Sequence, residues 1–104
     1  YEVHDIGIKE VLKKIPDGAN YYITFDADGM DPTIMPAVNA PTPGGLNWLQ
    51  VRELIHGIVN KGRVIGFDLV EISPSFEKGN KTIIHAERLI CNLIGAMVRA
   101  NYFN

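Results

Sequence analysis

The sequence predicts an α/β fold in which helices pack against a parallel sheet. Helix-like segments alternate with short apolar runs, in the order helix, strand, loop, helix, strand, helix, and this alternation is typical of parallel strands joined through helices. The 104 residues are 46% hydrophobic and 21% charged, as in ordinary globular domains. Because two strands make a poor sheet on their own, we expect further strands to come from an upstream part or from another chain.

The first half of the chain predicts one helix, one strand and a long loop. Asp5 is placed to cap a helix that residues 16–18 end. Residues 21–25 are aromatic or β-branched and predict a buried strand. The segment 31–45 contains four prolines and no periodicity, which predicts a stiff loop. The apolar face of the helix, at helical spacing, consists of Ile8, Val11, Leu12 and Ile15.

The second half predicts a helix, a strand and a final helix. Asn47 and Gln50 have the spacing of a capping box, and Gly62 is placed to end the helix that follows. Residues 64–72 predict a second buried strand, and Thr82 is placed to cap the last helix. The apolar stripe of the middle helix consists of Val51, Leu54, Ile55, Ile58 and Val59. The stripe of the last helix consists of Ala86, Leu89, Ile90, Leu93, Ile94 and Met97.

Charge and composition exclude several classes of partner. Ten Lys and Arg against twelve Asp and Glu give a net charge of −2, so neither nucleic acid nor an anionic membrane is expected as a partner. No apolar run approaches the roughly 20 residues of a membrane span. The single cysteine, Cys91, has no partner for an intrachain disulfide, which favours a cytoplasmic location. The chain starts at Tyr1 rather than Met, and we therefore expect it to be part of a longer protein.

Two aspartates follow the first predicted strand directly. In extended geometry Asp26 and Asp28 point the same way at the carboxyl end of that strand, where open α/β sheets bind ligands. Paired carboxylates suit Mg²⁺ or Mn²⁺. A bare Asp-x-Asp is equally typical of turn-forming and helix-capping aspartates, so the spacing alone leaves both interpretations open.

Two known kinds of Asp-x-Asp site fit this sequence unequally. A calcium loop of the EF-hand type needs Gly at its sixth position and Glu at its twelfth. Counting from Asp26, these positions hold Asp31 and Ala37, so a calcium loop is excluded. A phosphohydrolase of the haloacid dehalogenase type, with Asp26 as nucleophile and Asp28 beside it, remains an alternative, although Met30 stands where such enzymes prefer Thr or Val.

A longer match indicates a family. Residues 25–32 read FDADGMDP and are followed by Pro36 and by TPGGL at residues 42–46, while residues 66–74 read GFDLVEISP. The two motifs, in this order, resemble the signatures of the ureohydrolases, the arginase and agmatinase family, and the 66–74 segment is closer to the agmatinase branch. The resemblance implies an arginase-like three-layer α/β/α fold with a parallel sheet. Residues 1–104 would then be the C-terminal portion of a single domain.

The same resemblance implies an activity and a set of site residues. The activity is hydrolysis of linear guanidino compounds such as agmatine, with release of urea, at a binuclear manganese site. Asp26 matches the carboxylate that bridges two manganese ions, and Asp28 matches one that binds the second ion, both being catalytic. Glu71 matches the partner of the substrate guanidinium, which suits paired hydrogen bonds. Asp68 and Asp31 match positions that support the metal ligands, Asp31 mainly as a turn former.

Two departures from the family pattern limit these expectations. The motifs that supply the other metal ligands, G-G-D-H and D-A-H-x-D, do not occur here, and two carboxylates cannot fill a binuclear site. We therefore expect this chain alone to be inactive. Val38 and Ala40 replace small hydroxyl residues in the substrate loop, so agmatine, guanidinobutyrate and other guanidino acids all stay open as substrates. A non-catalytic ureohydrolase-like module is the alternative class of function.

Two further expectations follow from the resemblance and from spacing. Relatives form trimers or hexamers, so a homo-oligomer is expected, with the last helix and the C-terminal tail as contact surfaces. None of His4, His56 and His85 has a ligand-like spacing to the aspartates, and each is predicted to be structural. Trp48 is predicted to lie in a core or an interface.

Overall fold

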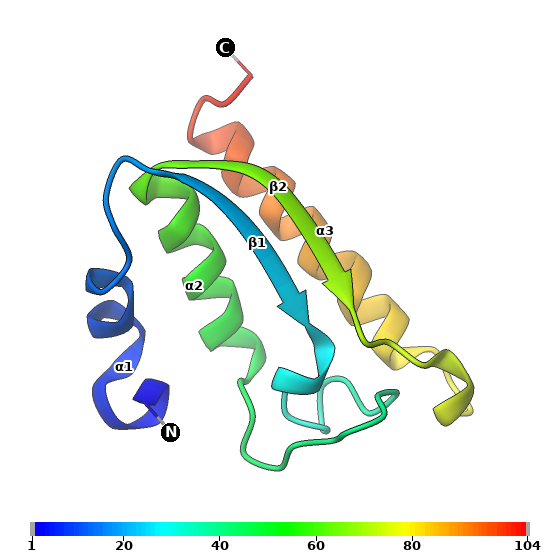
Figure 1. Cartoon of the computed structure of the whole chain (residues 1–104). Helices are drawn as coiled ribbons and strands as arrows, with labels where there is room; N and C mark the ends of the chain where they lie inside the picture. The colour runs from blue at the N-terminus through cyan, green and yellow to red at the C-terminus, as the bar shows by residue number, and fades with distance from the viewer. Residues whose placement is uncertain (1, 104) are drawn as a thin grey trace.

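The computed structural model describes residues 2–103 and places helices over one face of a small parallel sheet (Figure 1). Helices α2 and α3 lie side by side behind the sheet, and α1 packs beside α2. Two short 3₁₀ turns, η1 (Ala27–Gly29) and η2 (Pro74–Phe76), follow the strands. The main elements in chain order are α1 (Glu2–Lys13), β1 (Asn20–Asp26), α2 (Trp48–Lys61), β2 (Arg63–Val70) and α3 (Lys81–Arg99).

Because the two strands are parallel, their carboxyl ends lie side by side at the same end of the sheet. Within residues 2–103, β1 and β2 form a two-stranded parallel sheet in which Thr24 lies opposite Asp68 and Asp26 lies opposite Val70. Opposed residues of a sheet share a face, and the two faces alternate along each strand. Ile23 and Phe67 therefore point toward the helices, whereas Thr24, Asp26 and Asp68 belong to the open face. The α/β class and the parallel sheet are confirmed.

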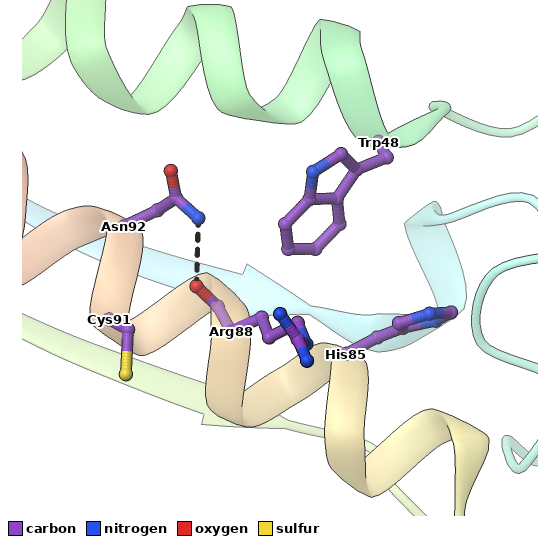
Figure 2. A pocket seen from close by; sticks show the side chains of 5 residues that line it. All are labelled: Trp48, His85, Arg88, Cys91 and Asn92. Atoms are coloured by element: carbon purple, nitrogen blue, oxygen red, sulfur yellow. Dashed lines mark hydrogen bonds between the residues drawn. The ribbon is translucent and has the colours of Figure 1, made fainter.

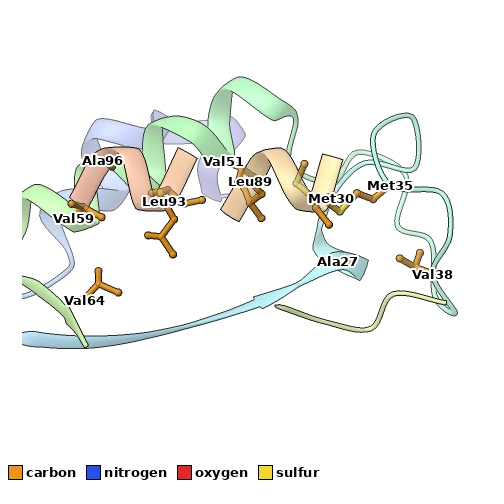
Figure 3. Close-up of a cluster of buried hydrophobic side chains, with 12 residues drawn as sticks. Ala27, Met30, Met35, Val38, Val51, Val59, Val64, Leu89, Leu93 and Ala96 are labelled. Carbon is orange, nitrogen blue, oxygen red and sulfur yellow. The ribbon is translucent and has the colours of Figure 1, made fainter. Parts of the chain in front are cut away.

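The hydrophobic core lies between the sheet and the helices and extends under the long loop. Val51 and Val59 of α2 and Leu89 and Leu93 of α3 are buried against the sheet. Figure 3 shows Met30, Met35 and Val38 gathered near Ala27, where β1 ends. The loop is thus fixed by its own apolar side chains, which explains why a segment with so little secondary structure holds a defined shape.

The capping box is confirmed, and the start of the first helix is corrected. Asn47 Oδ1 accepts from Gln50 N at 2.9 Å, and Asn47 N donates to Gln50 Oε1 at 3.0 Å. The first helix does not begin after Asp5. It begins at Glu2 and breaks at Gly7, where φ is 82° and ψ 163°, a conformation open essentially to glycine alone.

The second strand and the last helix also differ from the sequence prediction. Strand β2 ends at Val70 rather than at residue 72, because Glu71 adopts a positive φ of 68° that leaves the extended conformation. Thr82 does not cap α3. It lies inside the helix, fully buried, and its N–H donates to Glu77 Oε1 at 2.8 Å, so Glu77 satisfies an N-terminal donor that Thr82 was expected to satisfy.

The apolar stripe of α3 is only partly in the core. Ala86, Leu89 and Leu93 are buried, but Ile90 and Ile94 are 38% and 50% exposed. Ile90 and Ile94 therefore do not pack in the core with the other apolar residues of α3.

Among the helices of the described segment, none combines the length and the apolar character that crossing a membrane requires.

Candidate metal and guanidinium site

Asp26 and Asp28 sit on one tight turn at the carboxyl end of β1. Asp26 ends the strand in an extended conformation, and its Oδ1 accepts a hydrogen bond from Asp28 N at 2.9 Å. This bond caps η1, so Asp26 does form a turn. It occupies only one carboxylate oxygen, and Asp26 is exposed, so Oδ2 stays open to a cation. The turn-forming and metal-binding interpretations are therefore compatible.

Asp28 carries the sharper signal. Its side chain is partly buried, and Oδ1 is inaccessible to solvent without a hydrogen-bond partner in residues 2–103. Leaving a buried carboxylate oxygen unpaired is costly, and such atoms are rare unless an ion, a water or another chain completes them. The orphaned oxygen fits a hard divalent cation.

Asp68 has a second orphaned oxygen, on the open face of the sheet. Its Oδ1 is buried and unpartnered within the described segment, while Oδ2 accepts from the Tyr22 hydroxyl at 3.1 Å. This hydrogen bond to a carboxylate, helped by desolvation, raises the pKa of Tyr22 above its ordinary value. Tyr22 thus fixes one oxygen of Asp68, and the other has no hydrogen-bond partner among residues 2–103.

Gly66 makes room for this contact. A Cβ at Gly66 would lie 2.5 Å from two carbons of the Tyr22 ring, far inside van der Waals contact. The Tyr22 ring therefore packs over the Gly66 backbone, with its hydroxyl bonded to Asp68. A larger residue at position 66 would displace the ring. Tyr22 and Gly66 were not identified as site residues from the sequence. The alternation along β1, which gives Tyr22 the same face as Asp26, is the signal that identifies Tyr22.

Glu71 follows β2 at the edge where Asp26 follows β1. Val70 lies opposite Asp26, so Glu71 belongs to the same edge of the sheet, and its side chain is exposed. Its φ of 68° is uncommon for a residue other than glycine, and strained backbone of this kind costs of order 1–3 kcal/mol and concentrates at functional sites. The strain marks Glu71 as held in place rather than as a free strand terminus.

Asp31 has a structural task in the loop. Its Oδ1 accepts from Thr33 N at 2.9 Å and from the Thr33 hydroxyl at 2.6 Å, and its Oδ2 accepts from Gly44 N at 3.0 Å. The Thr33 hydroxyl, then the two backbone N–H groups, lower the pKa of Asp31. Both oxygens are engaged, so Asp31 closes the loop on itself.

Side chains of α3 fix the same loop from the other side. The Thr82 hydroxyl accepts from Ala37 N at 3.0 Å, and the Ile34 carbonyl accepts from His85 Nδ1 at 2.6 Å. Val38 is 3% exposed and packs in the core, whereas Ala40 is exposed. Val38 therefore belongs to the core under the loop, whereas Ala40 lies on its surface.

The donor set is suited to a divalent metal but incomplete. No group of three or more His, Cys, Asp or Glu in residues 2–103 is arranged to hold a metal ion. Carboxylates are nevertheless the ligands that Mn²⁺ and Mg²⁺ prefer, and two carboxylate oxygens, Asp28 Oδ1 on η1 and Asp68 Oδ1 on β2, are buried without a partner in the described residues. The residues present therefore fit part of a metal site.

Comparison with known proteins decides the family. A sequence model of the Arginase family matches residues 1–95. The chain belongs to the Arginase family. An agmatinase from Chromobacterium violaceum is 36% identical over 99 residues, covering 91% of this chain and 30% of that protein. A guanidinobutyrase from Pseudomonas aeruginosa is 38% identical over 94 residues, covering 86% and 29%.

The fold of the Arginase family agrees with the arrangement described above. The solved structure of proclavaminate amidino hydrolase from Streptomyces clavuligerus superimposes with a TM-score of 0.85 at 29% identity, covering 95% of this chain and 35% of that one. The arginase-like fold is thus confirmed. This chain spans about 30% of the length of the curated relatives it matches.

Proposed function

We propose that the protein hydrolyses the guanidino group of a small linear substrate and releases urea, and that this chain carries part of its metal site and the carboxylate that orients the substrate. The observation that carries the proposal is the orphaned Asp28 oxygen on the turn that follows β1. Membership of the Arginase family supports hydrolysis of this kind over the phosphohydrolase alternative.

Asp26 and Asp28 are the proposed ligands of two manganese ions. Asp26 offers the oxygen that its turn hydrogen bond leaves open, and Asp28 offers its orphaned oxygen. When bound, paired divalent ions supply an activated water at neutral pH. Asp68 accepts a hydrogen bond from Tyr22. Its proposed role is to support the metal ligands from outside the metal's own coordination sphere. Asp31 contributes by keeping the loop closed.

Glu71 is the proposed partner of the guanidinium. A planar guanidinium pairs best with a carboxylate that accepts two parallel hydrogen bonds. Glu71 is exposed at the same edge as the aspartates, and its unusual backbone conformation limits the directions in which it can project. Its role would be to orient the substrate and balance its charge, which places the guanidinium carbon for attack.

The substrate class is a guanidino compound with an aliphatic chain. Relatives named agmatinase and guanidinobutyrase are similar to this chain at 36% and 38% identity, so similarity does not separate a substrate with a terminal amine from one with a carboxylate. Agmatine is our first choice because residues 66–74 resemble the agmatinase branch. Guanidinobutyrate and arginine are the compounds to compare with it.

The test is manganese-dependent urea release by the complete natural protein. Asp26→Asn and Glu71→Gln are the variants, and Asp5→Asn and Glu87→Gln are the matched controls, since both of these carboxylates are exposed and lie outside the candidate site. Mutation of a residue that only hydrogen-bonds to a metal ligand lowers metal affinity or activity about 10- to 100-fold. Loss of a ligand itself should therefore reduce urea release at least about 100-fold. Glu71→Gln should mainly weaken substrate binding.

Two outcomes would contradict the proposal. Urea release that survives Asp26→Asn would exclude Asp26 as a ligand. Absence of urea from every guanidino compound, with manganese present, would favour the non-catalytic alternative. The 104-residue chain alone should release no urea, because its two carboxylates cannot complete a binuclear site.

We also propose that the complete protein forms a homo-oligomer, which light scattering would test.

A further inference from the structure

A pocket of about 380 Å³ lies between α2 and α3 and is separate from the Asp26–Asp28 turn. Figure 2 shows Trp48, from the start of α2, facing the side chains of His85 and Arg88 on α3 across this space. The Trp48 and His85 rings form a wall, with centroids 5.9 Å apart and planes tilted by 41°. The pocket is lined by Trp48, His85, Arg88, Cys91 and Asn92.

The orientation of His85 is fixed by a backbone acceptor. Its Nδ1 lies 2.6 Å from the Ile34 carbonyl oxygen, and because a carbonyl only accepts, Nδ1 must carry the proton. The neutral ring therefore keeps its lone pair on Nε2.

The pocket holds a cationic donor, Arg88, without an acidic partner. The Arg88 guanidinium makes no ion pair or side-chain hydrogen bond with any residue in 2–103, and the Trp48 indole N–H likewise has no acceptor there. Asn92 is already engaged, since its Nδ2 donates to the Arg88 carbonyl at 3.0 Å. No Asp or Glu lines the pocket. The charge of Arg88 therefore gives the pocket a positive character.

We propose that this pocket binds a small organic carboxylate. A guanidinium pairs with a carboxylate through two parallel hydrogen bonds, and the single fixed charge of Arg88 matches one negative charge. The face of Trp48 offers an apolar surface for the carbon chain. The ligand would contact His85, whose hydrogen bond to the Ile34 carbonyl anchors the 31–45 loop. The binding itself does not depend on the proposed hydrolase activity.

Trp48 is the only tryptophan among these 104 residues, so comparison with a Trp48→Phe variant isolates the emission change that comes from the pocket. The complete natural protein is titrated with sodium butyrate at constant ionic strength, with chloride as the balancing anion. Butyrate should change Trp48 emission saturably, and acetate should bind more weakly because it buries less apolar surface. Arg88→Gln should weaken butyrate binding at least about tenfold, since hydrogen bonds to a charged group are lost.

Arg52→Gln is the matched control. It removes the same charge from an exposed arginine of α2 that lies outside this pocket, and butyrate binding should be unchanged. Isothermal titration calorimetry gives a second readout that does not depend on Trp48. The proposal fails if butyrate produces no saturable signal, or if Arg88→Gln and Arg52→Gln behave alike. Tighter binding of inorganic phosphate than of butyrate would overturn the carboxylate assignment.

Discussion

The Tyr22 hydroxyl donates a hydrogen bond to Asp68 Oδ2 at 3.1 Å, linking β1 to β2 across the open face of the sheet. This bond fixes a carboxylate whose other oxygen is buried and unpartnered in the described residues. The Tyr22 ring lies over Gly66, where a Cβ would collide with it. Tyr22 and Gly66 therefore combine to orient the carboxylate of Asp68.

The first prediction concerns the pKa of Tyr22. Asp68→Asn should lower this pKa toward the ordinary value of about 10, because the carboxylate that favours the protonated phenol is removed. Since the folded pKa is raised, the contribution to stability is complete below about pH 10 and is lost as pH rises through the folded pKa. A pH titration of the Tyr22 ring carbon by NMR measures the shift.

Asp17→Asn is the control for this titration. Asp17 is exposed and paired with Lys61 at 2.8 Å, away from the open face of the sheet. Its replacement should leave the Tyr22 titration unchanged. If Asp68→Asn also left it unchanged, the hydrogen bond between Tyr22 and Asp68 would not exist in solution.

The second prediction separates stability from activity at Glu71. Asn tolerates a positive φ better than Glu, so Glu71→Asn should raise the free energy of unfolding by up to about 1 kcal/mol. Urea release by the complete protein should fall, because the longer carboxylate is lost. Glu71→Gln is the matched variant, since it keeps the strain and should leave stability unchanged. A destabilised Glu71→Asn protein would contradict the idea that position 71 is strained. Denaturant unfolding provides the measurement.

The third prediction follows from the lowered pKa of Asp31. A depressed carboxyl pKa stabilises the fold above the unfolded pKa of about 3.9, and that contribution is lost as pH falls through the folded value. The stability difference between the natural chain and Asp31→Asn should therefore be full near pH 6 and shrink as Asp31 becomes protonated.

Thermal unfolding between pH 2 and pH 7 would measure this difference in stability. Thr33→Val removes the hydroxyl donor that most lowers the Asp31 pKa, so its pH dependence should be weaker than that of the natural chain. A stability difference between Asp31→Asn and the natural chain that is independent of pH would contradict the assigned role of Asp31.

The sequence was informative where the signal was local. The capping box at Asn47 and Gln50 needs only two side chains at fixed spacing, and it formed as expected. The place of β1 followed from its aromatic and β-branched residues bounded by turn residues, although the strand runs from Asn20 to Asp26 and is half-buried and exposed by turns rather than buried as predicted. The turn at Asp26 was visible because Asp-x-Asp after a strand is both a capping pattern and a ligand pattern.

Features that depend on distant contacts were missed. Thr82 was assigned to a cap because capping is local, whereas its hydroxyl is used by Ala37, 45 positions away. Ile90 and Ile94 were counted as core because periodicity does not report which part of an apolar arc meets the sheet. The contact between Tyr22 and Asp68 needs the strand register, which no single segment of sequence contains.

The last prediction concerns this bond between Thr82 and the loop. Thr82 is fully buried, and its hydroxyl accepts from Ala37 N at 3.0 Å. Thr82→Val fills nearly the same volume but leaves the Ala37 N–H without an acceptor, so it should destabilise the protein by about 1–3 kcal/mol. Hydrogen exchange at Ala37 should accelerate more than exchange in α2, because the loop loses an anchor while the helix core is unchanged.

Two variants show whether the effect comes from the hydroxyl. Thr82→Ser retains the acceptor and should restore slow exchange at Ala37, although it leaves a small cavity. Thr42→Val removes an exposed hydroxyl of the same loop, which donates to the Ala40 carbonyl at 3.2 Å, and should change stability by no more than about 0.5 kcal/mol. Equal effects of Thr82→Val and Thr42→Val would show that the loop is held by its apolar residues Met35 and Val38 alone.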